Sequence, residues 1–546
     1  MVFSVIRLSS WGKYYGLRKV FKYLYGSVKN IIHFLKFLIV LFILKCEVYV
    51  KILSLKFIFG NKKRGIKMTI APIQVTNHRY RLGYHLMAPA GWINDPNGLC
   101  YFQGYYHVFY QYHSYSATWG PMSWGHARSR DLLHWQTLPI AIKPDNWTDH
   151  DGCFSGSALI KDQGLYLLYT GNNYYNRSNV NEYWQNQNLA ASYDGLHFTK
   201  YLNNPVIAQP PLDNTENFRD PKVWEYDGFY YAVIGGQSPT GLGQLLFYQT
   251  ADLKHWHYLG ILARAQTAAT EGYMWECPDL FRLNGQDILL ISPQGIQAQA
   301  QRYLNLYQTG YFVGRLDYQQ PALVHGSFQE LDQGHDFYAA QTMLTPDGRR
   351  IMIGWLNMWD NEMLEQADGW AGALTLPREL VYKNEHLYQQ PIAETKTLRQ
   401  RILFNKSWPT KQTVTLIQGY SQLEINLKID LAKTNDLNLN IKMSDPQTPN
   451  HLTLQYNQTR HQFILYNFNR PGVRIAALSS CPELKLQIFL DTSSVEIFLN
   501  DGAAVLTERY YFQNSPLITM TTDKAADVQC VIYQLSSQTN NYHYEI

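Results

Sequence analysis

The sequence predicts an all-β protein in which a five-bladed β-propeller is followed by a C-terminal β-sandwich. Between Tyr84 and Val381, short strand-like runs alternate with Gly, Asn, Asp and Pro turns, without a long stretch of helical periodicity. The most apolar of these runs recur at a nearly constant interval. Beyond them, a second region alternates apolar and polar residues with a period of two, which is typical of a sandwich.

The repeat consists of five units. The starts of the five apolar runs are separated by 60, 64, 58 and 63 residues. These runs are 106–111, 166–170, 230–234, 288–291 and 351–355. A second marker, Asp-x-x-His followed by an aromatic residue, occurs between them at 131–135, 194–198 and 252–256. Because each unit is too small to bury its own sheet, we expect the units to pack as propeller blades.

Changes in composition set the predicted domain boundaries. Residues 78–388 are expected to form the propeller and 404–546 the sandwich. Residues 389–403 are expected to be a linker, because they combine Pro391 with a run of mixed charge. Within the sandwich region, 495–502 is a strand that leads into an Asn-Asp-Gly turn, a good hairpin signal. The sandwich region has no cluster of unusual acids, so we expect it to support the propeller.

Residues 1–67 differ in composition from the rest. They contain 14 Lys and Arg against the single acid Glu47, whereas the remainder contains 33 basic and 42 acidic residues. The apolar run 31–44 is shorter than the roughly 20 residues of a membrane span, and no signal-peptide cleavage site follows it. We therefore expect a non-domain extension, with Met68 as the true start. A basic anchor on a membrane surface is the alternative.

The amino-acid composition limits the classes of partner that the protein is expected to bind. A net charge of +4 over 546 residues predicts no nucleic-acid partner, and no membrane partner is expected for the body. Aromatic residues make up 14%, with 41 Tyr, which favours β-structure and a surface that stacks on sugar rings. The six cysteines lack metal-ligand spacing, and five of them lie in the body. An odd number of cysteines in the body favours reduced thiols and a cytoplasmic location. The sequence leaves open whether the protein forms a homo-oligomer.

Three acids stand in unusual local settings. They are Asp95 in Trp92-Ile-Asn-Asp-Pro-Asn-Gly98, Asp220 in Phe218-Arg-Asp-Pro221 and Glu276 in Trp275-Glu-Cys-Pro-Asp279. The first run is rich in turn formers and is predicted to be a tight turn between strands. Taken singly, each acid could also be a turn residue, an Arg partner or a loop carboxylate. Because they fall in different repeat units, we expect them to meet in the funnel around the propeller axis and to cleave a glycosidic bond.

Over residues 78–546, the chain resembles glycoside hydrolase family 32, which contains invertases, sucrose-6-phosphate hydrolases and fructanases. The resemblance rests on motifs that follow the family's order. They are Trp92-Ile-Asn-Asp-Pro-Asn-Gly98, Trp124-Gly-His-Ala127, Phe154-Ser-Gly-Ser157, Phe218-Arg-Asp-Pro221, Trp275-Glu-Cys-Pro278 and Leu376-Pro-Arg-Glu-Leu380. Family members combine a five-bladed propeller with a C-terminal sandwich, which agrees with the repeat count.

The resemblance implies Asp95 as nucleophile, Glu276 as general acid/base and Asp220 as a stabiliser that binds sugar hydroxyls. It also implies a set of substrate contacts. These are Asn94, Gln111, Trp119, Phe154, Ser155, Arg219 and Trp355. No metal and no organic cofactor is implied. Two positions depart from the family pattern, namely His113-Ser114 in place of Asn-Pro, and Ala340 in place of Pro; we expect both to affect only the rim of the pocket.

The implied roles need different protonation states. A retaining glycosidase uses two carboxyl groups about 5–5.5 Å apart, one ionised to attack and one protonated to assist the leaving group. Trp275 and Cys277 are weakly polar neighbours that would favour the protonated form of Glu276. Arg219 is expected to keep Asp220 ionised, which makes Asp220 a hydrogen-bond acceptor and a poor acid.

The predicted substrates are sucrose 6-phosphate and sucrose, with the phosphorylated form preferred. Residues 272–281 and 292–295 resemble the intracellular sucrose-6-phosphate hydrolases more than secreted fructanases. Three alternatives stay open: an inulin or levan hydrolase, an inverting glycosidase for arabinose-containing polymers with acids about 6.5–9.5 Å apart, and a fructan-binding lectin. The lectin would be expected to lack at least one of the three acids. The residues that bind the phosphate are not identifiable from the sequence.

Overall fold

The structure is a computed structural model that describes residues 71–537. The predictions for residues 1–67, including the start at Met68 and the membrane-surface alternative, lie outside the described residues. The same holds for the end of the sandwich beyond residue 537. Within the described part, no helix has the length and apolar character needed to cross a membrane. The five cysteines of this range, Cys100, Cys153, Cys277, Cys481 and Cys530, are free thiols.

The all-β prediction is confirmed. In the described residues the helical elements are short: α2 (Ala268–Glu271) and the 3₁₀ helices η1 (Leu364–Asp368) and η2 (Ala393–Leu398). All other regular elements of this range are strands. They form five sheets between residues 91 and 391, followed by two six-stranded sheets.

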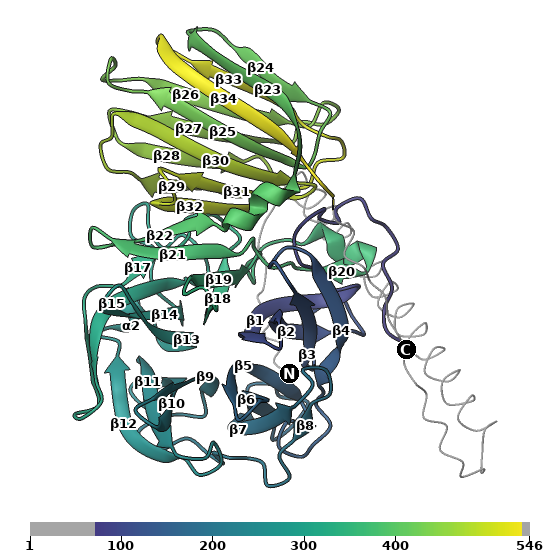
Figure 1. Cartoon of the computed structure of the whole chain (residues 1–546), viewed down its shortest axis with the longest axis vertical. Helices are drawn as coiled ribbons and strands as arrows, with labels where there is room; N and C mark the ends of the chain where they lie inside the picture. Colours follow the sequence, from purple (N-terminus) through teal and green to yellow (C-terminus); the bar gives the residue numbers. More distant parts are fainter. Residues whose placement is uncertain (1–70, 538–546) are drawn as a thin grey trace, which may run out of the picture. The chain divides into compact units, whose positions relative to one another are not determined.

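The first five sheets form the propeller (Figure 1). The first sheet contains β1 (Gly91–Phe102), β2 (Tyr105–His113), β3 (Ser123–Ser129) and β4 (Trp135–Ile142), with β20 (Trp370–Ala371) beside β1. The second contains β5 (Gly152–Lys161), β6 (Gly164–Tyr174), β7 (Tyr183–Ser192) and β8 (Thr199–Lys200). The third contains β9 (Phe218–Tyr226), β10 (Phe229–Gln237), β11 (Gly243–Thr250) and β12 (His257–Arg264).

The fourth sheet contains β13 (Met274–Leu283), β14 (Gln286–Gln294), β15 (Gly310–Asp317), β16 (Ala322–His325) and β17 (Gln329–Glu330). The fifth contains β18 (Tyr338–Leu344), β19 (Arg350–Trp355), β21 (Arg378–Lys383) and β22 (His386–Pro391). The first strands of the sheets contact one another in a closed ring: β1 with β5, β5 with β9, β9 with β13, β13 with β18, and β18 with β1. These five strands therefore surround the propeller axis (Figure 1).

The sequence repeat corresponds to this sheet order. The five apolar runs lie in β2, β6, β10, β14 and β19, the second strand of each sheet, where both faces are covered. The Asp-x-x-His markers are turns between the third and fourth strands of the first three sheets. In the first of them, Asp131 Oδ1 accepts hydrogen bonds from the backbone N–H of Leu133 at 3.1 Å and His134 at 2.8 Å. The aspartate thus fixes the turn, which explains its recurrence.

The prediction of a tight turn at Trp92–Gly98 is wrong, because this run lies inside β1. Its register with β2 shifts between Ile93 and Pro96, and again between Asn97 and Cys100. These shifts are β-bulges, which accommodate the same residue types as turns and re-aim side chains near functional sites. Gly98 adopts φ +53°, and a Cβ there would lie 2.8 Å from the Phe109 ring.

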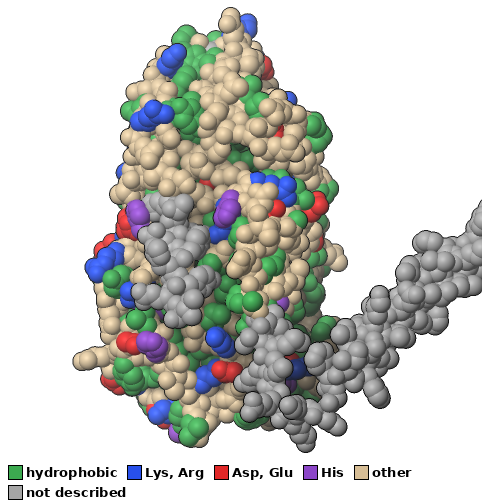
Figure 2. Space-filling view, turned by 90° about the vertical axis from the view of Figure 1, so that its right-hand side faces the viewer, with side chains coloured by type: hydrophobic (Ala, Val, Ile, Leu, Met, Phe, Trp, Pro, Cys, Tyr) green, Lys and Arg blue, Asp and Glu red, His purple; other side chains and the backbone are tan. Residues whose placement is uncertain are grey.

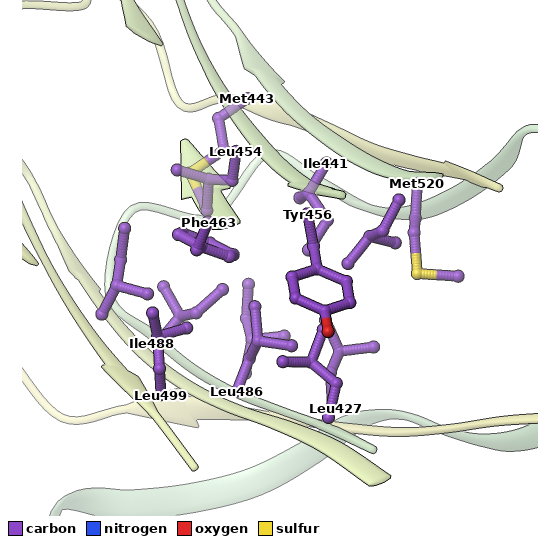
Figure 3. Close-up of a cluster of buried hydrophobic side chains, with 14 of the residues drawn as sticks. Leu427, Ile441, Met443, Leu454, Tyr456, Phe463, Leu486, Ile488, Leu499 and Met520 are labelled. Carbon is purple, nitrogen blue, oxygen red and sulfur yellow. The ribbon is translucent and has the colours of Figure 1, made fainter. Parts of the chain in front are cut away.

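The two six-stranded sheets form the predicted sandwich. One has the order β23 (Arg399–Thr410), β34 (Ala526–Leu535), β25 (Leu423–Asp430), β30 (Glu483–Asp491), β31 (Ser494–Leu499) and β32 (Ala504–Arg509). The other has the order β24 (Val414–Gln418), β33 (Leu517–Thr522), β26 (Asn438–Ser444), β27 (His451–Asn457), β28 (Gln462–Asn467) and β29 (Val473–Ala477). Figure 3 shows side chains of both sheets meeting in a continuous apolar core. The predicted hairpin is present as β31, a turn at 500–503, and β32.

The expected linker 389–403 is mostly regular structure. Its first residues complete β22, which pairs with β21, and its last residues begin β23 of the sandwich. Between them the mixed-charge run forms η2, where Glu394 accepts hydrogen bonds from Arg349 Nη1 at 3.0 Å and Nη2 at 2.7 Å. Strand pairing and this ion pair therefore order a stretch whose Pro and charge content indicated a linker.

Buried ion pairs join the propeller to the sandwich. The Arg378 guanidinium of β21 donates to Glu496 Oε2 of β31 at 2.6 Å and to Asp332 Oδ2 at 3.0 Å. His85, in the segment before β1, lies 2.8 Å from Asp491 Oδ2 and 3.0 Å from Glu496 Oε1. Burial alone would lower the pKa of His85, but these two carboxylates outweigh burial and raise it to about 9. This connection fits the supporting role expected for the sandwich.

The surface carries charges of both signs. On the face in Figure 2, basic and acidic side chains of the described residues are interspersed over the surface. Residues 68–546 contain 33 basic and 42 acidic residues, so this part of the chain has no excess of positive charge. An electrostatic footprint for nucleic acid would instead gather Lys and Arg in one stripe or patch.

Candidate active site

The structure brings the three candidate acids together. Asp95, Asp220 and Glu276 lie near the starts of β1, β9 and β13, which are inner strands of three different sheets. The negative charges of Asp220 and Glu276 both act on Asp95, and that of Glu276 acts on Asp220. Residues up to 181 positions apart in sequence therefore share one electrostatic environment at one end of the propeller axis.

Asp95 has few hydrogen-bond partners. Ser155 Oγ, from β5, donates to its Oδ2 at a long 3.4 Å, and its Oδ1 is buried without a protein partner among the described residues. Asn94 Oδ1 accepts from Trp92 Nε1 at 2.7 Å, which leaves the Asn94 amide group to stabilise the Asp95 carboxylate. Burial, assisted by the two neighbouring acids, outweighs this and raises the pKa of Asp95 to about 7.

Asp220 is held by the backbone around it. It adopts φ +66°, a conformation that non-glycine residues rarely take and that clusters at functional sites. Its N–H donates to Thr170 Oγ1 at 2.9 Å, and its Oδ2 accepts from the Cys277 N–H at 2.9 Å. Burial raises the pKa of Asp220 to about 6, although Arg219 and the Cys277 N–H act in the opposite direction.

Glu276 makes the strongest side-chain contacts of the three acids. Arg219 donates to its Oε1 from Nε at 3.0 Å and from Nη2 at 2.9 Å, and Tyr338 Oη donates to its Oε2. The charge of Arg219 lowers the pKa of Asp220, as expected, but burial outweighs this effect. The hydrogen bonds of Arg219 to a carboxylate go to Glu276, because the guanidinium reaches across from β9 to β13. Asn217 Oδ1 orients the same guanidinium by accepting from Nη1 at 2.7 Å.

The expected influence of Trp275 and Cys277 on Glu276 is not through direct contact with its carboxylate. Trp275 is buried and donates from Nε1 to the Glu271 carbonyl at 2.6 Å. The Cys277 thiol contacts Asp220 Oδ2 at 3.7 Å. The register of β13 shifts between Glu276 and Asp279, and Cys277 adopts φ +48°, so the Cys277 thiol lies beside Asp220 and not beside the Glu276 carboxylate.

The other predicted contact residues are distributed between the pocket and its walls. Phe154 of β5 is half-buried and packs edge-to-face with Trp119 at 6.0 Å, and Trp119 is 41% exposed. Gln111 of β2 is buried and donates to the Cys153 carbonyl at 3.0 Å. Trp355 of β19 has no exposed surface; its ring packs 5.7 Å from that of Trp92. A direct substrate contact of Trp355 stays a prediction.

Two aromatic residues of this site are not singled out by the sequence. Tyr338 is the first residue of β18 and contacts Glu276 directly. Trp359 is partly exposed and stacks on Trp92 at 5.9 Å. Its ring is therefore available to contact a ligand, whereas that of Trp355 is buried. The only signal for Tyr338 is its position near Ala340, in a segment that departs from the family pattern.

Comparisons with known proteins give one consistent match. The profile of the glycosyl hydrolases family 32 N-terminal domain matches residues 85–391, and that of the family 32 C-terminal domain matches 394–533. The sucrose-6-phosphate hydrolase of Escherichia coli is 41% identical over 435 residues, covering 79% of this chain and 89% of that protein. The sucrose-6-phosphate hydrolase of Bacillus subtilis (strain 168) is 38% identical over 468 residues, covering 84% and 94%.

Solved structures agree with the sequence comparison. A family 32 beta-fructofuranosidase of Bombyx mori superposes with a TM-score of 0.77 at 37% identity, and the match covers 85% of this chain and 95% of that one. A variant of the same Bombyx mori protein was solved in complex with sucrose.

Proposed function

Because this chain belongs to the glycosyl hydrolases family 32, we propose that it is a β-fructofuranosidase that hydrolyses sucrose 6-phosphate and sucrose. The observation that carries the proposal is the convergence of Asp95, Asp220 and Glu276 from three inner strands on one buried site. The relatives named sucrose-6-phosphate hydrolases match most of the chain. The match extends over both the propeller and the sandwich.

The first half of the reaction forms a fructosyl-enzyme. Asp95, with an Oδ1 that has no protein partner among the described residues, attacks the anomeric carbon of the fructosyl unit. Glu276 donates its proton to the glycosidic oxygen, and glucose 6-phosphate or glucose leaves. Asp220, fixed by the Cys277 N–H at 2.9 Å, accepts hydrogen bonds from sugar hydroxyls. These hydrogen bonds become stronger as the sugar ring distorts towards the transition state, which lowers the activation barrier.

The second half releases fructose. Glu276, now ionised, takes a proton from water, and the resulting hydroxide attacks the anomeric carbon while its bond to Asp95 breaks. Two displacements at the same carbon retain its configuration. Arg219 and Tyr338 donate to the two oxygens of Glu276 and hold this carboxyl group in one orientation through both steps. Arg219 and Tyr338 are thus positioning residues.

The cycle begins with one proton on the acid pair. The negative charge of Glu276 acts on Asp95 and is one of the causes, after burial, that raise the pKa of Asp95. Because the pKa of Asp95 is raised to about 7, its ionised form becomes dominant only as the pH rises through this value. The reactive arrangement has that proton on Glu276 and the negative charge on Asp95.

Sugar rings are held by the polar and aromatic residues around the acids. Asn94 and Ser155 lie beside Asp95, and the edge-to-face pair of Trp119 and Phe154 forms an aromatic wall. Aromatic rings of this kind pack against the apolar faces of sugars. Gln111 and Trp355 are buried and act mainly by shaping these walls.

Arg177 is our candidate for recognition of the phosphate. It follows β6, at the end of the second sheet where Ser155 and Phe154 lie. Its Nε donates to Asp151 Oδ1 at 2.6 Å, and its side chain is 67% exposed, which leaves its terminal nitrogens accessible. A guanidinium matches the geometry of a phosphate group. Because phosphorylated sugars are found inside cells that import them, we also propose a cytoplasmic location.

Trapping the intermediate tests the proposed chemistry. Glu276→Ala slows proton donation, but a fructoside whose leaving group needs no proton should still transfer its fructosyl unit to Asp95. Mass spectrometry should then find a fructosyl group on the peptide that contains Asp95. Equal losses of rate for activated and natural substrates would remove Glu276 from the acid role, and a label on another residue would remove Asp95 as nucleophile.

A further inference from the structure

A second cavity lies at the opposite end of the propeller axis. Its volume is about 770 Å³, within the range of pockets that hold small molecules. All five inner strands contribute to it through residues that follow their active-site residues in sequence. These lining segments are 99–101 of β1, 158–160 of β5, 222–226 of β9, 280–282 of β13 and 342–344 of β18. The cavity is therefore separate from the acid cluster, although the same strands form both.

A charged cluster forms the buried end of this cavity. Lys222 Nζ lies 2.9 Å from Asp279 Oδ2 and 2.9 Å from the Thr342 carbonyl. The Thr342 N–H donates to the same Asp279 oxygen. Asp279 has no exposed side-chain surface, and Lys222 is almost fully covered. One carboxylate thus compensates one ammonium group.

Arg350 adds a second cation without a second anion. Its guanidinium makes one long hydrogen bond, from Nη1 to Thr342 Oγ1 at 3.4 Å, and lies over the Phe281 ring, 4.6 Å from the ring centroid. Among the described residues, its Nε is buried without a partner and no carboxylate forms an ion pair with it. Burial lowers the pKa of Arg350, and burial together with Arg350 lowers that of Lys222.

The remaining lining charges do not remove this excess. Arg282 pairs with Asp287 at 3.3 Å, and Arg315 and Glu225 also line the cavity. The cavity and the cluster beneath it therefore hold four cations and three carboxylates among the described residues. A buried cation without a counter-charge is costly, and a bound anion reduces that cost. Trp224, Tyr226 and Tyr318 supply an aromatic wall beside these charges.

We propose that this cavity is a binding site for a phosphate group, either inorganic phosphate or the phosphate of a small phosphorylated sugar, with Arg350 as its central donor. The terminal nitrogens of Arg350 make only one long hydrogen bond, so they can donate to a phosphate from more than one atom. Lys222 adds a point charge beside it. The aromatic wall offers a surface for a sugar ring, so a sugar phosphate has more to contact than inorganic phosphate.

Thermal unfolding of the full chain tests this site. Inorganic phosphate is titrated at constant ionic strength, with potassium chloride as the balancing salt and fructose present to occupy the active site. For wild type we expect Tm to rise by about 1–2 °C at phosphate tenfold above Kd. Arg350→Gln should lose this rise. An equal rise in both proteins, or no rise in wild type, would overturn the proposal.

A second variant supplies the missing anion within the chain. Leu344 pairs with Arg350 across β18 and β19 and is 58% exposed, so a Glu at this position would reach the guanidinium. Leu344→Glu should raise Tm without phosphate and abolish the further rise on adding it. Leu202→Glu, at an exposed position outside the cavity, is the control and should respond to phosphate as wild type does. A retained phosphate response in Leu344→Glu would also contradict the proposal.

Glucose 6-phosphate separates the two sources of the phosphate group. If the sugar is recognised, it should raise Tm at lower concentration than inorganic phosphate, and Arg350→Gln should lose that difference. A response to glucose 6-phosphate that survives Arg350→Gln would place its binding elsewhere, such as the active site. If the response to inorganic phosphate is still lost in Arg350→Gln, that result assigns the cavity to inorganic phosphate. If both responses survive, the proposed phosphate site is overturned without effect on the proposed hydrolase activity.

Discussion

Arg219 donates two hydrogen bonds to a single oxygen of Glu276, from Nε at 3.0 Å and from Nη2 at 2.9 Å. The other oxygen of Glu276 accepts from Tyr338. The carboxyl group of the proposed acid is therefore fixed at both oxygens before substrate arrives. Such preorganisation by charged donors is one of the larger contributions to catalysis.

Arg219→Lys should lower kcat/KM by roughly 10²–10³, because an ammonium group cannot reproduce the two-bond geometry of the guanidinium. Most of the loss should appear in kcat, since Glu276 would be misplaced in the transition state. Steady-state kinetics with sucrose measure both kcat and kcat/KM. The control is Arg264→Lys, which should change kcat/KM little. This variant also removes a guanidinium that donates to a side chain, since Arg264 Nε donates to Gln244 Oε1 at 2.8 Å. Similar kinetics for both variants would contradict the role of Arg219.

The pH dependence should report the raised pKa values of the two aspartates. The pKa is about 7 for Asp95 and about 6 for Asp220, and both residues must be ionised to act. Raising the pH through this range therefore adds activity, and lowering it removes activity. We expect kcat/KM to rise between about pH 5 and 7, roughly tenfold per unit where one group titrates. A flat profile down to about pH 4.5 would contradict the proposed environment of Asp95.

The interface between propeller and sandwich should weaken at alkaline pH. His85 has a folded-state pKa of about 9, above its ordinary value of 6.5, because Asp491 and Glu496 stabilise its charged form against burial. Its stabilisation is thus complete below about pH 6.5 and is lost as the pH rises through 9. The loss can reach about 3 kcal/mol.

Denaturant unfolding of wild type and His85→Gln between about pH 6 and 10 measures this contribution. The difference in free energy of unfolding between the two proteins should be largest near the acidic end of this range and should shrink towards its alkaline end. Taking the difference cancels the titration of groups that both proteins share. A difference that stays constant over this range would show that the protonation of His85 does not stabilise the interface.

Arg177→Gln should reduce kcat/KM for sucrose 6-phosphate by about 10-fold or more and leave that for sucrose within about twofold. Loss of a guanidinium from a phosphate removes a charge-assisted hydrogen bond, which the unphosphorylated substrate never makes. Paired kinetics on the two substrates give the ratio directly. Equal losses for both would instead assign Arg177 a role in folding of the rim, through Asp151.

Much of this architecture follows from the sequence because it rests on repetition and composition. The apolar runs and the Asp-x-x-His turns mark the sheets, and the spread of Asp95, Asp220 and Glu276 over different units implies convergence at the axis. The predicted tight turn at Trp92–Gly98 was wrong, because β-bulges within a strand contain the same residue types as turns. The hydrogen-bond partner of Arg219 could not be predicted either, because Glu276 lies 57 residues away on another strand.

Contacts between segments that are distant in sequence were the hardest features to predict from the sequence. Tyr338 reaches Glu276 from a strand 62 residues away, and nothing in its local sequence marks a functional hydroxyl. His85 belongs to the apolar lead into β1 and would ordinarily be assigned to the core. Its two carboxylate partners come from the sandwich, 406 and 411 residues later.

The most direct test of the central claim compares kcat/KM for sucrose 6-phosphate, sucrose, inulin and levan with one preparation of the full chain. The proposed function predicts cleavage of both disaccharides at the fructosyl bond, with sucrose 6-phosphate the better substrate and both polymers slower. Faster cleavage of inulin or levan than of either disaccharide would identify a fructan hydrolase and contradict the proposed function.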